Sequence, residues 1–546
     1  MRRAALVAVV AAASLALPGV AEAARVAVGL APGADARVVS AAVAERTGTR
    51  PESLQPIRAL VADVPDGVTL EGIAGIRYVE RLVSRQLAYT PNDPLAAKQW
   101  YLPYSGFYSS WITLPSFESI PVAVIDSGVD ASHPDLAGKI LDAESFVGGS
   151  ARVDTLGHGT FVSGLIAAGV NNGIGIAGLA PSAELLVAKV VTKSRAIPVE
   201  AEAKAIRWAV DNGARVINMS LGGIRDPLDP DRDTYSRLEA DAIAYAVANG
   251  VVVVAAVGNS DGAPSSPWKY ASYPAALPHV LGVSATTDTG AVPSFSNRDR
   301  VYNDIAAPGL RILSVLPRPL TARYPACGEQ GYSSCGPEDY REAQGTSFAA
   351  PQVSAAAAVL LSLRPTLRPE QVTKILQSAA IDLDSSTGCS ACAAGRDAYS
   401  GWGRLDVAAA IAALSKRLPA RDHYETNDDL GSRAYVTYGS NRRLHATVDF
   451  WDDQDDVYAI QLARNQPVYV GLTGEDTTVE LGLALWNAKA RSVENVSDFR
   501  HRLATSTRPG SRQFLSFRPK AGGTFYVQVR MASPGTTRYR LTVVKG

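Results

Sequence analysis

Four polar residues occupy positions where a serine-based acyl-transfer reaction could be built. Ser347 follows Gly345 and opens an Ala-rich apolar segment that is predicted to be helical, so the unpaired N–H groups of a first helical turn lie beside it. Asp126 ends the apolar run PVAVI, and Asn259 comes just after the apolar run VVVVAAV. His158 stands between two glycines at the start of another predicted helix. Such a reaction needs a hydroxyl nucleophile, an imidazole base, a carboxylate that orients the base and a donor for the oxyanion.

Each of these residues also has a purely structural interpretation. Ser347 could only cap its helix, and the carboxylate of Asp126 could only cap the turn that follows its strand. The Asn259 side chain could hydrogen-bond its own loop, and a single histidine such as His158 is more often structural. Their presence together in one chain favours the catalytic interpretation, because each supplies a part that the others need.

The apolar patterns around these residues predict an α/β fold with a parallel central sheet. Strands are predicted at 122–125, 184–190, 216–219, 251–257 and 280–285, and helices at 159–168, 198–212 and 235–249. Continuous Val-rich strands that alternate with helices are typical of a sheet covered by helices on both faces. In such sheets the active site gathers at the carboxyl ends of the strands, where Asp126 and Asn259 are placed. Residues 91–415 are therefore predicted to form one catalytic domain.

The two ends of the chain have different patterns. Residues 1–23 contain two arginines, an apolar run and a small-residue cleavage site, which is typical of a secretory signal peptide. Residues 24–90 predict a compact α+β unit, and residues 427–546, after a polar linker at 416–426, predict a β-sandwich. The predicted elements of the first unit are strands at 25–30, 57–64 and 78–83 and helices at 35–46 and 69–74; the sandwich strands are predicted at 446–450, 457–462, 468–472, 481–486, 524–530 and 539–544.

Composition and cysteine content limit the possible functions. The chain has 53 basic and 53 acidic side chains, so nucleic acid is not an expected partner. No later apolar run approaches the length of a membrane span, so we expect an exported, soluble monomer without a membrane partner. Four cysteines in an exported chain predict two disulfides, for which we favour the local pairs Cys327–Cys335 and Cys389–Cys392. The CxxC sequence of the second pair could instead be a redox or zinc motif.

Five stretches of the chain carry a family resemblance. VAVIDSGVD, GHGTFVSGLIAA, INMSLGG, AAVGNS and GTSFAAPQVSAAAAVLL resemble the subtilisin-like serine proteases (subtilases, peptidase family S8), and they follow that family's order within 121–363. The resemblance implies that Ser347 attacks the scissile carbonyl, that His158 transfers the proton and that Asp126 orients the imidazole. It also implies that the Asn259 side chain and the Ser347 backbone N–H bind the oxyanion.

The same resemblance implies a substrate-binding strand and a specificity pocket. Ser220, Leu221 and Gly222 would pair with an extended peptide and form one wall of the S1 pocket, and Ser272 would lie near its floor. No acidic residue is evident at these positions, so we expect medium or large apolar P1 residues.

A structural calcium ion is also implied by the resemblance. The matching ligands are the side chains of Asp93, Asp135 and Asn172 and the backbone carbonyls of Val170, Ile174 and Ile176. Carboxylate, amide and carbonyl oxygens are the ligands that Ca²⁺ prefers. A Gly/Asn-rich turn without metal is the alternative.

The resemblance extends to both ends of the chain. Residues 24–90 resemble the inhibitory propeptide of the subtilases, and residues 427–546 resemble the bacterial pre-peptidase C-terminal domain. The implied function is a secreted serine endopeptidase (EC 3.4.21) that acts on proteins and peptides, processes its own zymogen and is inhibited by its own propeptide. The alternative is an inactive protease-like scaffold that binds or adheres to a partner through its C-terminal sandwich.

Overall fold

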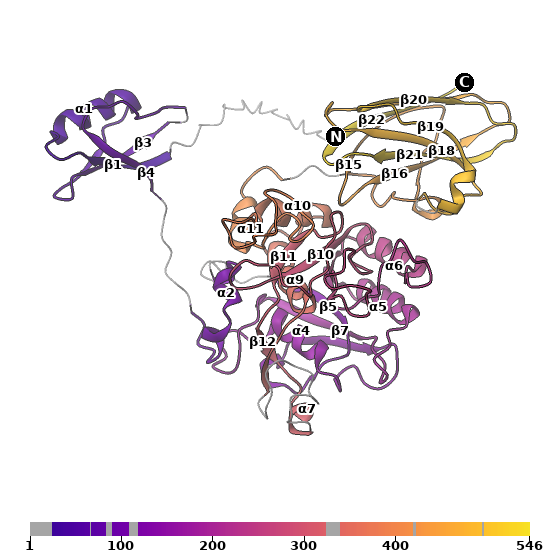
Figure 1. Ribbon diagram of the computed structural model, residues 1–546, viewed down its shortest axis with the longest axis horizontal. Helices are drawn as coiled ribbons and strands as arrows, with labels where there is room; N and C mark the ends of the chain where they lie inside the picture. The colour runs from indigo at the N-terminus through magenta and orange to yellow at the C-terminus, as the bar shows by residue number, and fades with distance from the viewer. Residues whose placement is uncertain are drawn as a thin grey trace, which may run out of the picture. The chain divides into compact units, whose positions relative to one another are not determined.

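The computed structural model describes residues 24–65, 67–82, 90–108, 118–323, 339–418, 422–493 and 496–546 (Figure 1). The predicted signal peptide and the predicted pair Cys327–Cys335 lie outside these ranges. The chain divides into two compact units, Met1–Leu87 and Ala88–Gly546, which are described separately below.

The first unit is an antiparallel sheet with one helix, as the predicted α+β class requires. Its strands β1 (Ala24–Leu30), β2 (Glu52–Leu54), β3 (Ala59–Val64) and β4 (Ile76–Arg81) have the order β2-β3-β1-β4, and helix α1 is Ala36–Thr47. The carboxylate of Asp35 caps α1 by accepting a hydrogen bond from the Arg37 N–H. The helix predicted at 69–74 is wrong, because Gly72 and Gly75 adopt left-handed φ angles of 81° and 90° and the segment forms turns.

A seven-stranded parallel sheet forms the centre of the second unit. Its order is β11-β10-β9-β8-β5-β7-β6, and every neighbouring pair runs parallel. The strands are β5 (Ile120–Asp126), β6 (Ile140–Ser145), β7 (Ala183–Lys189), β8 (Val216–Met219), β9 (Val252–Ala256), β10 (Val280–Thr286) and β11 (Ile305–Pro308). The five strands predicted from Val-rich runs are confirmed to within two residues. Strand β6 is missed because half of it is polar, and β11 because it has only four residues.

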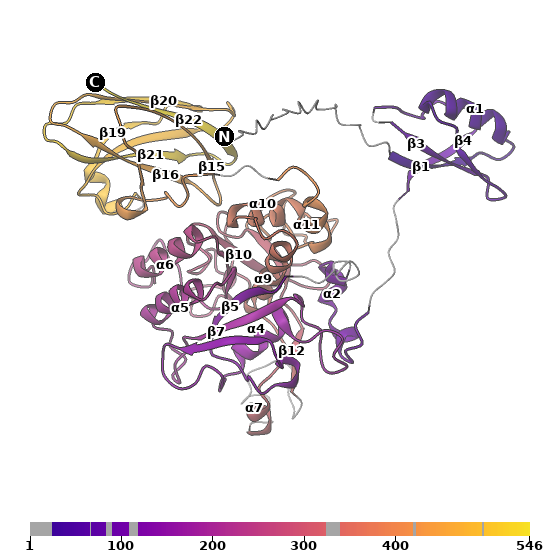
Figure 2. The same ribbon diagram turned by 180° about the vertical axis from the view of Figure 1, so that it is seen from behind.

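Helices cover both faces of this sheet, which confirms the predicted fold class. Helices α4 (His158–Ala167), α9 (Thr346–Leu363), α10 (Pro369–Ala379) and α11 (Val407–Ala413) contribute side chains to the hydrophobic core on one face. Helices α5 (Val199–Asp211) and α6 (Arg237–Ala248) contribute to the core on the other face, and they lie side by side in both views (Figures 1 and 2). The shorter elements of this region are η1 (Ala96–Lys98), α2 (Tyr101–Tyr104), η2 (Pro134–Leu136), β12 (Ile312–Val315), α7 (Arg318–Arg323) and β13 (Tyr340–Ala343).

Helix α9 is the central helix of the first core. By length and composition it would be long and apolar enough to cross a membrane, contrary to our expectation that no segment approaches that length. However, 89% of this helix is buried inside the molecule, as expected for the core helix of a folded domain. The helix also contains Pro351, which has no N–H and cannot donate to the carbonyl oxygen four residues earlier.

Two buried glutamates face the packing region of α5 and α6. Glu202 on α5 and Glu239 on α6 are 5% and 4% exposed. Burial raises the pKa of Glu202 to about 8, with a further contribution from the charge of Glu239, and burial raises the pKa of Glu239 to about 7. At neutral pH the folded protein therefore holds at least one of these carboxyl groups in the protonated form.

This pair predicts a loss of stability at alkaline pH. Because both folded pKa values lie above the unfolded value near 4.5, the contribution to stability is complete below pH 4.5 and is lost as the pH rises through about 7 to 8. In a Ser347→Ala background, Glu202→Gln should raise the free energy of unfolding at pH 9 by roughly 2 kcal/mol and change it little at pH 5. Thermal unfolding at the two pH values measures this, with exposed Glu200→Gln as the control. An equal effect of both substitutions at pH 9 would contradict the assignment.

The C-terminal part is a β-sandwich, as predicted. One sheet has the order β14-β16-β21-β18-β19 and the other β15-β22-β17-β20, and a core that includes Val448, Tyr458, Val470, Leu485 and Leu541 joins them. Its elements are η3 (Gly431–Arg433), β14 (Tyr435–Val436), β15 (Asn441–Asp449), β16 (Asp455–Leu462), β17 (Val468–Gly474), β18 (Leu481–Asn487), η4 (Val496–His501), β19 (Arg502–Ser506), β20 (Arg512–Phe517), β21 (Gly523–Met531) and β22 (Thr536–Lys545). The six predicted strands are present; β14, β19 and β20 are missed because they are short or largely exposed.

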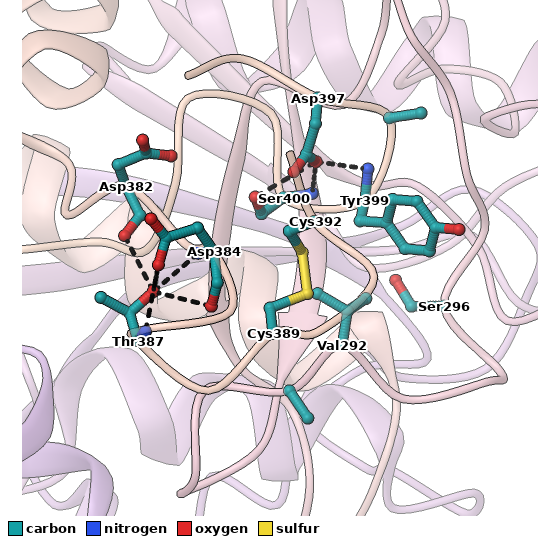
Figure 3. Close-up of a disulfide and its surroundings, with 12 residues drawn as sticks. Val292, Ser296, Asp382, Asp384, Thr387, Cys389, Cys392, Asp397, Tyr399 and Ser400 are labelled. Atoms are coloured by element: carbon teal, nitrogen blue, oxygen red, sulfur yellow. Dashed lines mark hydrogen bonds between the residues drawn. A yellow bond between two sulfur atoms is a disulfide. The ribbon is translucent and has the colours of Figure 1, made fainter. Parts of the chain in front are cut away.

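Cys389 and Cys392 form a disulfide, which confirms the predicted local pair (Figure 3). Both cysteines are buried in a small cluster with Ala306 and Leu383. The Asp384 carboxylate, which accepts hydrogen bonds from the backbone before Cys389, and Asp397 hold the flanking turns. The disulfide therefore closes a structural loop, and its sulfur atoms are not free for a metal site.

Candidate active site

Asp126 and His158 contact each other at the carboxyl end of β5. The Nδ1 atom of His158 lies 2.9 Å from both carboxylate oxygens of Asp126. Asp126 is the last residue of β5 and is 2% exposed, and His158 is the first residue of α4. A Cβ atom added at Gly159 would lie 2.2 Å from the carbonyl oxygen of Gly128. The absence of a side chain at Gly159 therefore lets α4 approach the turn after β5 and brings the imidazole to the carboxylate.

A second carboxylate, Asp154, fixes the start of α4. Its Oδ2 accepts hydrogen bonds from the N–H and the hydroxyl of Thr160, and its Oδ1 accepts from the Gly157 N–H and the Ser127 hydroxyl. Ser127 Oγ in turn accepts from the Gly159 N–H. Asp154 thus ties the turn after Asp126 to the helix that carries His158. Our sequence analysis missed it, although an acid four residues before a histidine at a helix start was the available signal.

The surroundings raise the pKa of His158 above its ordinary value of 6.5. Burial by itself lowers this pKa, but the charge of Asp126 and its hydrogen bond raise it more, and the charge of Asp154 adds to the effect. The imidazole must be neutral before it can accept a proton from a hydroxyl group. Any reaction that uses His158 as a base should therefore gain rate as the pH rises through this raised pKa and level off above it.

Ser347 lies in the first turn of α9 and is bonded to Ser220 in both directions. The Ser347 hydroxyl donates to the carbonyl oxygen of Ser220 at 3.1 Å, and the Ser220 hydroxyl donates to the carbonyl oxygen of Ser347 at 2.7 Å. The Ser347 carbonyl is available because Pro351, four residues later, has no N–H to donate to it. The ring of Phe348, the next residue, lies 5.5 Å from the imidazole of His158, measured between centroids. The start of α9 thus approaches the His158 imidazole through Phe348, while the Ser347 hydroxyl is directed to Ser220.

The amide of Asn259 has one end fixed and the other end directed to the cleft. Its Oδ1 accepts hydrogen bonds from the N–H of Thr346 at 2.8 Å and from the Thr346 hydroxyl at 2.9 Å. The Nδ2 atom is therefore the end that remains available as a donor. Asn259 and Ser347 line the same cavity.

A cavity of about 170 Å³ lies next to Ser347 and Asn259. Ser220, Leu221, Gly222 and Ser272, the four residues predicted to bind substrate, all line it. The lining also contains residues that the sequence analysis did not place, namely Ile224, Ser260, Asp261, Ala263, Trp268, Asn297 and Thr346. Asp261 supplies a carboxylate that was not expected at this site.

Comparisons with known proteins identify the family. The profile of the subtilase family matches residues 118–405, which is more than half of the chain. This chain belongs to the subtilase family. Subtilisin E of Bacillus subtilis (strain 168) is 35% identical over 309 residues, which cover 55% of this chain and 72% of that protein. Fervidolysin of Fervidobacterium pennivorans is 31% identical over 384 residues, which cover 63% of this chain and 51% of that protein.

The comparisons also indicate the class of reaction. These relatives and the family match make this chain a serine peptidase of the subtilisin family. A solved structure of a protease from Pseudoalteromonas arctica covers 60% of this chain and 99% of its own chain, with 29% identity and a TM-score of 0.48.

A polar network between the end of β8 and helix α9 of this subtilase was not predicted. The Asn218 side chain donates from Nδ2 to Ser220 Oγ at 3.0 Å and accepts at Oδ1 from the Ser354 hydroxyl at 2.9 Å. Asn218 and Ser354 are fully buried, on β8 and α9. The network orients the Ser220 hydroxyl toward Ser347. An asparagine inside the apolar strand VINM was the signal that we overlooked.

The structure also brings together the side chains of the predicted calcium ligands. Asp93 and Asp135 are 3% and 1% exposed. The Asp93 carboxylate accepts from the N–H groups of Asn171 and Asn172, and Asp135 accepts from Asn172 Nδ2 at 2.9 Å and from the Ile176 N–H at 2.9 Å. Burial raises the pKa of Asp135, and the charge of Asp93 contributes to this, while these hydrogen bonds oppose it. Two buried carboxylates and an amide oxygen are the kinds of ligand that Ca²⁺ prefers, and in this structure each of these oxygens accepts a hydrogen bond from the loop.

Proposed function

We propose that this subtilase is a secreted serine endopeptidase that cleaves proteins and peptides and is made as a self-processing zymogen. The contact of His158 Nδ1 with Asp126, beside the helix start that carries Ser347, is the observation that supports this proposal most. The cavity next to Ser347, which the four predicted substrate-binding residues line, supports it further. Export and self-processing rest on the sequence of residues 1–90 and on the family relationship.

In the proposed mechanism each residue has one task. The Ser347 hydroxyl leaves its bond with the Ser220 carbonyl, gives its proton to His158 Nε2 and attacks the scissile carbonyl to form an acyl-enzyme. Asp126 keeps the proton of the neutral imidazole on Nδ1 and stabilises the imidazolium that forms. The Asn259 Nδ2 and the Ser347 N–H donate to the oxyanion, and His158 then returns the proton to the leaving amine.

Residues 24–90 are the proposed propeptide. All but the last three of these residues belong to the separate compact unit Met1–Leu87, whose sheet and helix form their own hydrophobic core. A segment that folds by itself can be cut off without disturbing the core of the catalytic unit. We propose that this unit inhibits the enzyme until the enzyme cuts the link between them.

Covalent labelling tests the proposed nucleophile. A fluorophosphonate reagent should form a bond between phosphorus and Ser347 Oγ, with loss of fluoride and transfer of the serine proton to His158. Peptide mass mapping should find the adduct on Ser347 in the native protein and on no serine after heat denaturation. If the native protein stays unlabelled while subtilisin E is labelled under the same conditions, the inactive scaffold becomes the better account.

We further propose that Asp93, Asp135 and Asn172, with the carbonyls of Val170, Ile174 and Ile176, bind a structural Ca²⁺ ion. The carboxylates would neutralise the ion and the carbonyls would complete its oxygen shell. The ion would hold the loop after α4 against the segment at Asp93, and it has no proposed part in the chemical steps.

Calcium removal should lower stability in a way that depends on Asp135. At about 100 times its dissociation constant, Ca²⁺ should stabilise the Ser347→Ala protein by about 2.7 kcal/mol relative to protein in chelator. Asp135→Asn should abolish this difference, because it removes a buried charge at the site, whereas the exposed Asp142→Asn should keep it. Thermal unfolding with and without Ca²⁺ measures the effect. A calcium response that survives in Asp135→Asn would place the ion elsewhere.

A further inference from the structure

Four ionisable side chains converge outside the active site. His279 lies just before β10, whereas Glu425, Asp428 and Asp453 belong to the C-terminal part of the chain that forms and borders the β-sandwich. One possible ligand atom from each of the four lies within 4.8 Å of all the others. We call these four residues the His279 cluster. It joins the part of the chain that carries the active site to the β-sandwich.

The His279 cluster carries more negative than positive charge. His279 Nε2 lies 2.6 Å from Asp428 Oδ1 and 3.4 Å from Glu425 Oε2. Among the described residues, no lysine or arginine forms an ion pair with Glu425, Asp428 or Asp453. The neighbouring acids Asp449 and Asp452 differ, because Lys374 Nζ lies 2.6 and 2.7 Å from their carboxylates. Within the described ranges, three largely buried carboxylates of the cluster thus have one imidazole as their only ionisable basic partner. Burying these negative charges costs free energy unless another cation offsets them.

Several oxygen atoms at the cluster have no donor. The Glu425 side chain is 6% exposed, and in the described part of the chain its Oε1 has no hydrogen-bond partner. The same holds for Asp453 Oδ1 and for Oδ1 of the fully buried Asn427, whose Nδ2 donates to Asp456. An unpaired buried acceptor costs about 1–3 kcal/mol, more when it is charged. A metal ion can supply the partner that such a group of unpaired acceptor oxygens lacks.

The backbone and the space around the cluster agree with a binding role. His279 has a φ angle of 60°, in the left-handed region that residues other than glycine adopt at a cost. This conformation aims the imidazole at Asp428. A cavity of about 600 Å³ is lined by His279, Glu425 and Asp453, so an ion has a route to the cluster.

We propose that the His279 cluster binds a divalent cation that accepts both nitrogen and oxygen ligands, such as Zn²⁺ or Mn²⁺, and that the ion links the catalytic region to the β-sandwich. Imidazole nitrogen and carboxylate oxygen together are typical ligands of these ions. The neutral Nε2 of His279 gives up its bond with Asp428 and coordinates the ion, and Glu425, Asp428 and Asp453 supply the oxygens. Two positive charges then offset most of the three negative ones.

Metal binding to the full-length Ser347→Ala protein tests the proposal. After removal of metals with a chelator and dialysis, isothermal titration with Zn²⁺ should give one tight site, which also raises the thermal midpoint. His279→Ala and Glu425→Gln should each weaken this site by about 100-fold or more. The exposed residues His445 and Glu480 provide matched controls, since His445→Ala and Glu480→Gln should leave the affinity unchanged. Circular dichroism of the metal-free variants verifies that each is folded.

Three outcomes would overturn the proposal. The first is that the folded parent protein binds neither Zn²⁺ nor Mn²⁺, in which case protonated His279 is the only counter-charge of the cluster. The second is an affinity that His279→Ala leaves unchanged. The third is binding of Ca²⁺ alone in the Asp135→Asn variant, since an all-oxygen site would not link the two regions through His279. None of these outcomes bears on the proposed peptidase activity.

Discussion

Ser347→Ala is expected to abolish peptide hydrolysis and to leave residues 24–90 attached to the secreted protein. The substitution removes the hydroxyl that would form the acyl-enzyme, and no neighbouring group replaces it. In subtilisin the loss of the catalytic serine lowers kcat by about 10⁶-fold, and we expect an effect of that order here. Intact mass over time, with wild type and variant side by side, measures the processing, and a chromogenic peptide measures the turnover.

The contrast between the two proteins decides the interpretation. If wild type alone loses its N-terminal segment near Tyr89, Ser347 is a working nucleophile and the cleavage is its own. Ser362→Ala is a useful control, because this serine is near the end of the same helix and its hydroxyl donates to the Val359 carbonyl without lining the cleft. Equal processing of wild type and Ser347→Ala would assign the cut to another protease and leave only the peptide assay to test catalysis.

Asn259→Ala should lower kcat by about 10²–10³-fold with a small change in KM, as the loss of the corresponding oxyanion donor does in subtilisin. The reason is that a donor directed at the oxyanion contributes mainly in the transition state. Alanine also removes the acceptor that Asn259 offers to Thr346, so a structural effect has to be separated from the loss of the donor.

Asn259→Asp makes that separation. Aspartate can keep both bonds from Thr346 but places a carboxylate oxygen where the amide donor stood. It should therefore lose at least as much activity as the alanine variant while it retains the stability of the parent, measured by thermal unfolding. Asn249→Ala at the exposed end of α6 serves as the neutral control. Full turnover in either Asn259 variant would contradict the oxyanion role.

The sequence was sufficient for features that depend on local pattern. Val-rich runs place β5, β8 and β10 to within two residues. The glycines around His158 indicate the close approach that α4 makes to the turn after β5. It was insufficient where the structure depends on partners distant in sequence. Asp154 and Asn218 each had a weak local signal, but their partners, and the cavity that Asp261 lines, are supplied by segments distant in sequence.

Helix and strand prediction failed for a different physical reason. The segment at 69–74 has helical spacing, but two nearby glycines in left-handed conformations turn the chain. Strand β6 has three polar residues among its six and pairs in parallel with β7, while its Ile140 and Ala143 pack against the core. At 69–74 the conformational freedom of the glycines outweighs the helical spacing of the apolar residues. In β6 the pairing with β7 stabilises a strand that the sequence pattern does not indicate.

The proline within α9 has a consequence for how the enzyme should lose activity. Because Pro351 frees the Ser347 carbonyl for Ser220, the proposed nucleophile is anchored to the residue that follows β8 as well as to its own helix. Helix α9 and strand β8, which precedes Ser220, both contribute to the hydrophobic cores. The core is the last region to open in a cooperative domain. Ser347 therefore has little freedom to shift while the rest of the domain stays folded. Inactivation by heat should coincide with global unfolding of the catalytic unit instead of preceding it.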